Sequence, residues 1–189
     1  MTTRRPVESF SSPVEKIKQG YYTDAYFMRS EEILNGDNYH PRVLMQVFAR
    51  DHVVVCGTDE VIALIRQCAF HPETIEIHSL RDGEEVDEWE TVMTIEGDYA
   101  DFAHLETIYL GILARQSRIA TNVRRVVKAA NGKPVLFFPA RYDIYQTQES
   151  DGYAALVGGI HGFSTDANAL AAGGKGLGTI PHALIASYK

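Results

Sequence analysis

Cysteine is scarce in this sequence, where only Cys56 and Cys68 occur among 189 residues. Both lie in apolar surroundings, in the segments VVVCGT and RQCAFH. A disulfide framework needs several cysteines, and a structural zinc site needs clustered Cys or His ligands. The sequence therefore argues against both classes of small domain and predicts two buried, reduced thiols.

Long apolar runs are also missing, since no segment approaches the roughly 20 apolar residues that span a bilayer. The N-terminal stretch MTTRRPVESFSSPVEK contains basic residues, but the apolar stretch that a secretory signal requires does not follow it. We expect a soluble, cytoplasmic protein with no membrane partner.

Positive charge is in deficit, with 18 Lys and Arg against 25 Asp and Glu, a formal net charge of -7. Sequence-independent binding of nucleic acid needs a basic surface that displaces counterions from phosphates, so we expect no nucleic-acid partner. An anionic substrate would have to be bound by a few locally placed Arg or Lys. The histidines at 40, 52, 71, 78, 104 and 161 show no metal-ligand spacing, and no protein metal site is expected.

The residues that are present can form a core, because 45% of them are hydrophobic. In the first part of the chain, apolar periodicity and capping residues predict helices over 23–36 and 58–69, the second capped by Thr58. Alternating β-branched residues predict strands over 42–50, 52–57, 74–80 and 90–99. This order of helices and strands indicates a mixed α and β domain.

The second part of the chain has a different pattern. Two packed helices are predicted over 101–115 and 117–133, the second capped by Ser117 and ended by Asn131-Gly132. A short apolar strand, 135–138, and a helix from near Ser150 follow, which is typical of a parallel βα structure. We expect an α/β sandwich domain over 1–115 and the start of an α/β barrel over 116–189, because a complete barrel needs roughly 200 residues or more.

Six segments occur in an order and spacing that resembles the nicotinate phosphoribosyltransferases, with the nicotinamide and quinolinate enzymes as relatives. They are YYTDAYF, GDYADFAHLETIYLGIL, RIATNVRRVVKAANGK, FFPAR, GFSTDAN and GTIPHA. The resemblance runs from Gly20 to the end of the chain and covers the N-terminal half of such enzymes. It implies the type II phosphoribosyltransferase fold, an α/β sandwich domain followed by an incomplete α/β barrel, with active sites at a dimer interface.

The resemblance also implies roles for particular residues. Phe138 and Arg141 match an F-x-x-R motif in which the ring packs on the pyridine and the guanidinium binds an anionic group of either substrate. Tyr26 matches a tyrosine that reaches across the dimer to the same pyridine. His182 matches a histidine that ATP phosphorylates, with Thr179 fixing the turn before it. Taken without the motifs, each of these residues could serve in the core, on the surface or in a turn.

Asp166 departs from the pattern, because nicotinate enzymes have G-T-S-N where this chain has S-T-D-A-N. An acid here is usual in the nicotinamide-using relatives, since a carboxylate accepts a hydrogen bond from an amide but repels a carboxylate. The alternative is that Asp166 caps a helix that starts at Ala167. A basic helix face with Arg118, Arg124, Arg125 and Lys128 could meet phosphates or could be solvated.

The implied function is the joining of nicotinate to phosphoribosyl pyrophosphate, with release of pyrophosphate, in NAD biosynthesis. Mg²⁺ would enter with phosphoribosyl pyrophosphate, and ATP is the expected co-substrate. A homodimer or larger assembly is expected. Nicotinamide as the substrate, a quinolinate-type enzyme, and a non-catalytic remnant that acts as an interaction module are the alternatives.

Overall fold

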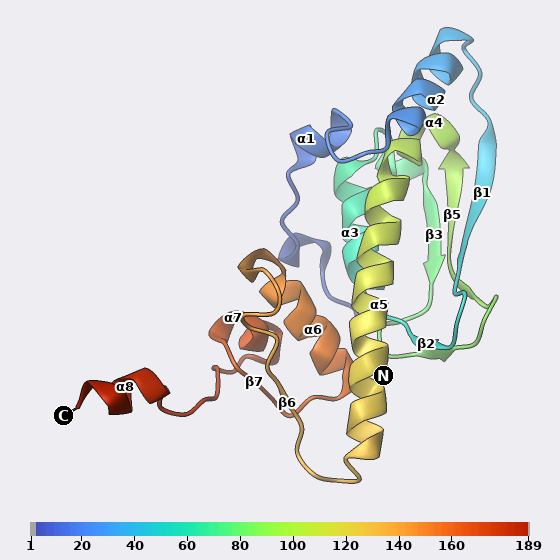
Figure 1. Ribbon diagram of the computed structural model, residues 1–189. Helices are drawn as coiled ribbons and strands as arrows, with labels where there is room; N and C mark the ends of the chain where they lie inside the picture. Colours follow the sequence, from blue (N-terminus) through green and yellow to red (C-terminus); the bar gives the residue numbers. More distant parts are fainter. Residues whose placement is uncertain (1–2, 189) are drawn as a thin grey trace. The chain divides into compact units, whose positions relative to one another are not determined.

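The computed structural model describes residues 3–188, which divide into two compact units between Thr121 and Asn122 (Figure 1). The boundary falls inside helix α5 (Glu106–Ala129), the same helix that contains the predicted boundary after residue 115. Each unit has its own sheet, so each is described by itself. No helix in the described part of the chain is both long enough and apolar enough to cross a membrane.

The first unit is built around an antiparallel sheet in the order β1-β5-β3 (Figure 1). Its strands are β1 (Arg42–Phe48), β3 (Glu76–Ser79) and β5 (Thr91–Asp98), and a second small sheet pairs β2 (Val53–Val54) with β4 (Glu85–Val86). The helices are η1 (Val7–Ser9), α1 (Val14–Lys18), α2 (Ala25–Gly36), α3 (Thr58–Cys68), η2 (Pro72–Thr74), α4 (Tyr99–Phe102), η3 (Ala103–Leu105) and α5. The strands predicted from alternating residues are thus confirmed.

The core of this unit lies between the sheet and helices α3 and α5. Ile65 of α3, Met93 and Ile95 of β5 and Leu113 of α5 belong to one buried apolar cluster. Figure 1 shows α3 and α5 together on one side of the sheet. Burial of such apolar surface is the main stabilising term in folding, and it makes this unit the predicted α/β sandwich.

Helix α5 is continuous, so the prediction of two helices with a cap at Ser117 is wrong. The Ser117 hydroxyl accepts from the backbone N of Cys56 at 3.0 Å and donates to its carbonyl at 3.2 Å. A serine is a frequent helix cap because it binds nearby backbone groups. Here Ser117 binds the backbone of Cys56, which is distant in the sequence, and the helix continues past Ser117 without a break.

The start of α3 also differs from the prediction, because its N-cap is Gly57, with φ 99°, and not Thr58. The backbone N and the hydroxyl of Thr58 both donate to Oδ1 of Asp82, each at 2.9 Å. Asp82 belongs to a turn 24 residues further along the chain and is almost fully buried. A carboxylate near a helix N-terminus is favourable, and here the tertiary fold supplies it.

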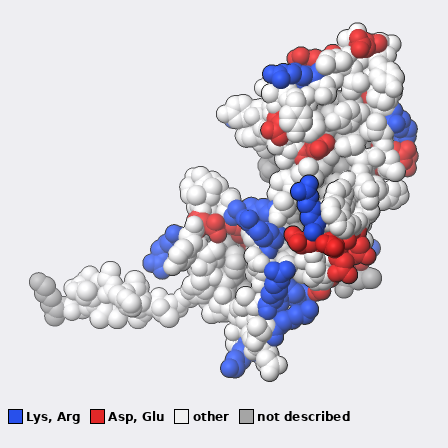
Figure 2. Space-filling model, turned by 45° about the vertical axis from the view of Figure 1, so that its right-hand side comes forward, with Lys and Arg blue, Asp and Glu red and all other residues white. Residues whose placement is uncertain are grey.

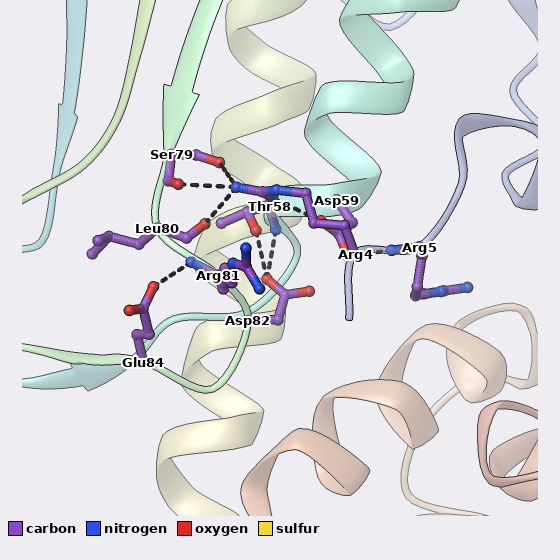
Figure 3. Close-up of polar contacts among 9 residues, drawn as sticks. All are labelled: Arg4, Arg5, Thr58, Asp59, Ser79, Leu80, Arg81, Asp82 and Glu84. Carbon is purple, nitrogen blue, oxygen red and sulfur yellow. Dashed lines mark hydrogen bonds and ion pairs between the residues drawn. The ribbon is translucent and has the colours of Figure 1, made fainter. Parts of the chain in front are cut away.

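The N-terminal segment is fixed to the same helix end through Asp59 (Figure 3). Its Oδ1 accepts from Nη1 of Arg4 at 2.8 Å, and its Oδ2 accepts from the backbone N of Arg5 at 2.8 Å. Arg4 also donates to the carbonyl and the hydroxyl of Ser79, at the end of β3. The segment before η1 is therefore part of the first unit's structure.

His104 is a fully buried titratable group in this unit. Its Nε2 is 3.1 Å from the carbonyl oxygen of Cys68, its ring lies 4.7 Å from that of Phe70, and its Nδ1 has no hydrogen-bond partner among the described residues. Burial lowers the pKa of His104, although the hydrogen bond to Cys68 opposes this effect. The folded chain thus holds the neutral imidazole.

The first prediction is a loss of stability in mild acid that depends on His104. The unfolded chain protonates this histidine near pH 6.5, while the folded chain resists protonation. The free energy of unfolding should fall as the pH drops from about 6.5 toward the lowered pKa, by up to about 1.4 kcal/mol per pH unit. His104→Gln keeps an N–H donor for Cys68 and does not titrate, so urea unfolding between pH 7 and 5 should show a flatter profile for this variant.

His71 has the opposite effect on the pH dependence of the free energy of unfolding. This effect is the same in the wild-type chain and in His104→Gln, so it cancels when the two are compared. Its hydrogen bond to Asp101, 2.7 Å long, raises the pKa of His71. Identical pH profiles for the wild-type chain and His104→Gln would contradict the prediction.

The second unit contains two parallel strands, β6 (Leu136–Phe137) and β7 (Gly162–Phe163), in the register Leu136↔Gly162 and Phe137↔Phe163. Between them lie η4 (Tyr145–Thr147) and α6 (Gln148–Gly158), which complete a βαβ unit. After β7 come α7 (Asp166–Ala169), η5 (Leu170–Ala172), a Gly-rich segment and α8 (His182–Ser187). The predicted change to parallel βα structure is confirmed.

Candidate functional site

A cavity of about 840 Å³ opens at the carboxyl ends of the two parallel strands of the second unit. Segments that follow β6 and β7 form part of its wall, and the segment that leads into α8 forms the rest. The residues that line it include Phe138, Arg141, Ser164, Leu177, Thr179 and His182. The carboxyl ends of parallel strands are where α/β folds place ligands, so this cavity is the candidate site.

Arg141 reaches the cavity from a tight turn directly after β6. The carbonyl of Pro139 accepts hydrogen bonds from the backbone N of Tyr142 at 3.0 Å and of Asp143 at 3.1 Å. This turn places Arg141 at φ 77°, in the left-handed region that non-glycine residues seldom adopt. Such a conformation costs on the order of 1–3 kcal/mol and clusters at functional sites.

The Arg141 side chain is exposed, and it forms no ion pair with a carboxylate in the described part of the chain. A guanidinium is a planar donor that binds a carboxylate or a phosphate through two parallel hydrogen bonds. The strained turn therefore presents an available anion-binding group to the cavity.

Phe138 supplies an aromatic surface beside it. The residue is 52% exposed, directly follows β6 and lies three residues before Arg141. An aromatic ring that is buried neither in the core nor against a neighbour can stack on a flat ligand. Phe138 and Arg141 together suit a flat, anionic ring.

Thr179 and His182 approach the cavity from the opposite segment. Pro181 precedes His182, which is the first residue of α8 and is exposed. Imidazole is a nucleophile near neutral pH because its ordinary pKa is near 6.5. The structure thus brings four of the six residues singled out in the sequence, Phe138, Arg141, Thr179 and His182, to one cavity.

Asp166 does not line this cavity. Its Oδ1 accepts a hydrogen bond of 2.7 Å from the backbone N of Gly176. The alternative that Asp166 caps a helix is wrong, because α7 begins at Asp166 and Thr165 is its N-cap, with the hydroxyl accepting from the backbone N of Asn168 at 3.1 Å. The carboxylate of Asp166 serves the Gly-rich segment.

Tyr26 lies on α2, in the first unit, and its side chain is 57% exposed. Its ring centroid is 4.3 Å from that of Phe27, which is buried. Desolvation and the charges of Asp24 and Glu106 raise the pKa of Tyr26, so the phenol stays neutral. The residue is free of the core and can meet a partner.

Ser164 and Leu177 are among the cavity residues that were not singled out from the sequence. Ser164 directly follows β7, and its position at a strand end could have identified it. Leu177 lies in a Gly-rich segment that was interpreted as a turn, and no local signal marks it. Its position depends on a hydrogen bond of its backbone N to the carbonyl of Phe163, 2.6 Å long.

The basic helix face separates into two kinds of residue. Arg124 donates from Nε to the carbonyl of Gly158 and from Nη2 to that of Val157, at 3.1 and 3.0 Å, so it caps the end of α6. Arg118, Arg125 and Lys128 are exposed. Figure 2 shows basic side chains gathered around the C-terminal half of α5.

Residues 24–117 match the sequence model of a family described as "Quinolinate phosphoribosyl transferase, N-terminal domain". A solved structure of nicotinate-nucleotide pyrophosphorylase from Pyrococcus furiosus is 34% identical, with a TM-score of 0.83, over 94% of this chain and 46% of that one. The chain has the fold of the N-terminal half of these phosphoribosyltransferases. The predicted fold class and the wider type II resemblance are thereby confirmed.

Two further structures share the fold at lower identity. Human nicotinic acid phosphoribosyltransferase is 16% identical, with a TM-score of 0.74, over 88% of this chain and 40% of that one. Nicotinate-nucleotide pyrophosphorylase from Francisella tularensis is 19% identical, with a TM-score of 0.57, over 79% and 53%. The chain spans about half the length of these relatives.

Proposed function

We propose that this chain supplies the pyridine-binding part of a phosphoribosyltransferase of NAD biosynthesis. In the proposed reaction, the pyridine nitrogen bonds to C1 of the ribose of phosphoribosyl pyrophosphate while the bond to pyrophosphate breaks. The observation that carries this proposal is the convergence of Phe138 and Arg141 on one cavity at the ends of β6 and β7. Phe138 would stack on the pyridine, and Arg141 would bind its carboxylate.

Nicotinate is the substrate that we propose. It has one carboxylate, and Arg141 is the one Arg or Lys among the described residues that line the cavity. Quinolinate is the second candidate, which the description of the family model favours, but its two carboxylates call for more positive charge. Nicotinamide lacks a carboxylate for Arg141, and the Asp166 carboxylate is already hydrogen-bonded to Gly176.

The cofactors and the partner are further parts of the proposal. His182 would take the γ-phosphoryl group of ATP, forming a nitrogen–phosphorus bond as ADP leaves. Mg²⁺ would enter with phosphoribosyl pyrophosphate, since no carboxylate is among the described residues that line the cavity. Among residues 3–188, no group of three or more His, Cys, Asp or Glu is placed to hold a metal ion, so no step is assigned to one.

A homodimer or larger assembly is a further part of the proposal, and it depends on Tyr26. We propose that its exposed ring completes the pyridine site of a partner subunit, as the family resemblance implies. Sedimentation at micromolar concentration should show a dimer or larger. A monodisperse monomer would count against the role of Tyr26 while leaving Phe138 and Arg141 untouched.

The choice of substrate is tested by measuring how tightly each pyridine binds to the 189-residue chain. NMR signals of the ligand report the binding. Nicotinate should bind more tightly than quinolinate, and nicotinamide should bind weakest, because the interaction with Arg141 requires one accessible carboxylate. Tighter binding of quinolinate would overturn the choice of nicotinate. Tighter binding of nicotinamide would overturn the role given to Arg141.

A turnover assay, combined with the binding measurement, separates the proposed function from the non-catalytic alternative. The chain is mixed with nicotinate, phosphoribosyl pyrophosphate, Mg²⁺ and ATP, and mononucleotide is measured. Turnover should be absent or very slow, because stabilisation of the departing pyrophosphate is usually the largest catalytic term and the chain matches only 46% of the Pyrococcus relative. Binding of nicotinate without turnover supports the proposal. Absence of both binding and turnover favours an interaction module.

A further inference from the structure

The segment 173–181, which we name the strap, links η5 to α8 and forms one side of the cavity. It has no regular secondary structure and contains four glycines, at 173, 174, 176 and 178. Leu177 and Thr179 of the strap line the cavity, and the strap leads directly into His182. The positions of Thr179 and His182 therefore depend on what holds the strap.

Two adjacent hydrogen bonds hold the strap at its middle. The backbone N of Gly176 donates to Oδ1 of Asp166 at 2.7 Å, and the backbone N of Leu177 donates to the carbonyl of Phe163 at 2.6 Å. The second bond joins the strap to the end of β7. The hydrogen bond to Asp166 has a side-chain acceptor, so a substitution of Asp166 removes it.

The strap also lies flat on the turn after β7. A Cβ atom at Gly176 would come within 2.9 Å of the backbone of Thr165 and 3.0 Å of the carbonyl oxygen of Ser164. These are backbone atoms, which cannot turn aside as a flexible side chain does. A Cβ atom at Gly178 would meet nothing within 4 Å, so the strap has room for a side chain at that position.

The carboxylate of Asp166 is not needed for the helix that it begins. Thr165 already caps α7, and α7 has only four residues. A carboxylate that accepts from a backbone N–H forms a stronger bond than a neutral acceptor. The hydrogen bond to Gly176 is thus the contact that accounts for an acid at this position.

We propose that Asp166 is a positioning residue, which holds the strap so that Thr179 and His182 line the cavity, and that it does not contact the pyridine. The part of this inference that concerns ligand binding rests on the proposed function. The part that concerns the strap rests on the geometry alone. The competing role is recognition of an amide substrate by the same carboxylate.

The experiment is backbone amide exchange by NMR on the full chain, with nicotinate binding measured on the same samples. In Asp166→Ala, the amides of Gly176 and Leu177 should exchange about 10-fold to 150-fold faster, because the charge-assisted hydrogen bond to the strap is lost. Exchange within α6 should not change. Nicotinate affinity should fall about fivefold to tenfold, because the strap that forms one side of the cavity loses its fixed position.

Three further variants make the result specific. Asp166→Asn keeps an acceptor oxygen but loses the charge, so its exchange rates and its affinity should lie between those of the wild-type chain and Asp166→Ala. Gly176→Ala should loosen the strap as Asp166→Ala does. Gly174→Ala should behave as the wild-type chain, because Gly174 does not line the cavity and a Cβ atom there would meet only the Cβ atom of Ala169, at 4.0 Å.

The outcomes distinguish this inference from the proposed function. Unchanged exchange at Gly176 and Leu177 in both Asp166→Ala and Gly176→Ala would overturn the positioning role. The competing result is that Asp166→Asn binds nicotinate better and nicotinamide worse than the wild-type chain does, with unchanged exchange at Gly176 and Leu177. That result would show that Asp166 contacts the substrate. If the wild-type chain binds no pyridine, the proposed function fails, and the exchange measurements still decide whether Asp166 holds the strap.

Discussion

Replacing Arg141 by glycine should raise the thermal stability of the second unit and at the same time remove its affinity for nicotinate. Glycine adopts φ 77° without the strain that arginine carries there, so the variant should gain about 1 kcal/mol of stability. Loss of the guanidinium removes a charged hydrogen-bond donor that contributes roughly 1.5–3 kcal/mol, which is a 10-fold to 150-fold loss of affinity. Calorimetric unfolding and nicotinate titration on the same protein measure both effects.

Asn131→Gly is the matched control for the gain in stability. Asn131 also has a positive φ, 46°, and belongs to the same unit, but it does not line the cavity. This variant should gain a smaller amount of stability, since Asn tolerates the left-handed region, and should bind nicotinate as the wild-type chain does. If Arg141→Gly binds nicotinate normally, Arg141 does not hold the carboxylate. If it is less stable than the wild type, the strain at residue 141 is disproved.

Replacing Gly152 by alanine should unfold the second unit or destabilise it by more than about 3 kcal/mol, the range of severe overpacking. A Cβ atom at this position in α6 would lie 2.1 Å from the carbonyl oxygen of Asn168 and 2.6 Å from its Cα. Because those atoms are backbone, α6 and α7 would have to separate. Circular dichroism and urea unfolding would detect the loss.

Gly111→Ala tests whether this effect comes from packing and not from the exchange of glycine for alanine. Gly111 is also inside a helix, α5, but a Cβ atom there meets nothing within 4 Å. Alanine should stabilise this helix by roughly 0.5–1 kcal/mol. A tolerated Gly152→Ala would show that α6 and α7 do not pack as closely as described.

The parts of the fold that sequence reasoning predicted are those that local pattern determines. The alternation of apolar residues in 42–48 and 91–98 needs one buried face, and the strands β1 and β5 follow from it. The errors concern residues with distant partners. Ser117 binds the backbone of Cys56, and Thr58 binds Asp82, and neither partner can be recognised from the neighbouring sequence.

The candidate site was predicted in part for the same reason. Phe138 and Arg141 follow a recognisable apolar strand, and the family resemblance drew attention to them and to His182. The strained turn at Arg141 and the close packing of the strap against the backbone of Ser164 depend on three-dimensional contacts, so the sequence alone does not reveal them. Asp166 shows the difference most clearly, because its residue type suggested a substrate contact and its geometry indicates a support for the cavity wall.

The two cysteines have a practical consequence for studies of this chain. Cys56 and Cys68 are free and buried in the first unit, and burial raises the pKa of both thiols. Since the thiolate is the form that reacts, alkylating reagents and oxidants should reach them only when that unit opens. A cysteine introduced into the second unit, on the strap for example, could be labelled selectively in the otherwise natural chain, while the native pair reports the opening of the first unit.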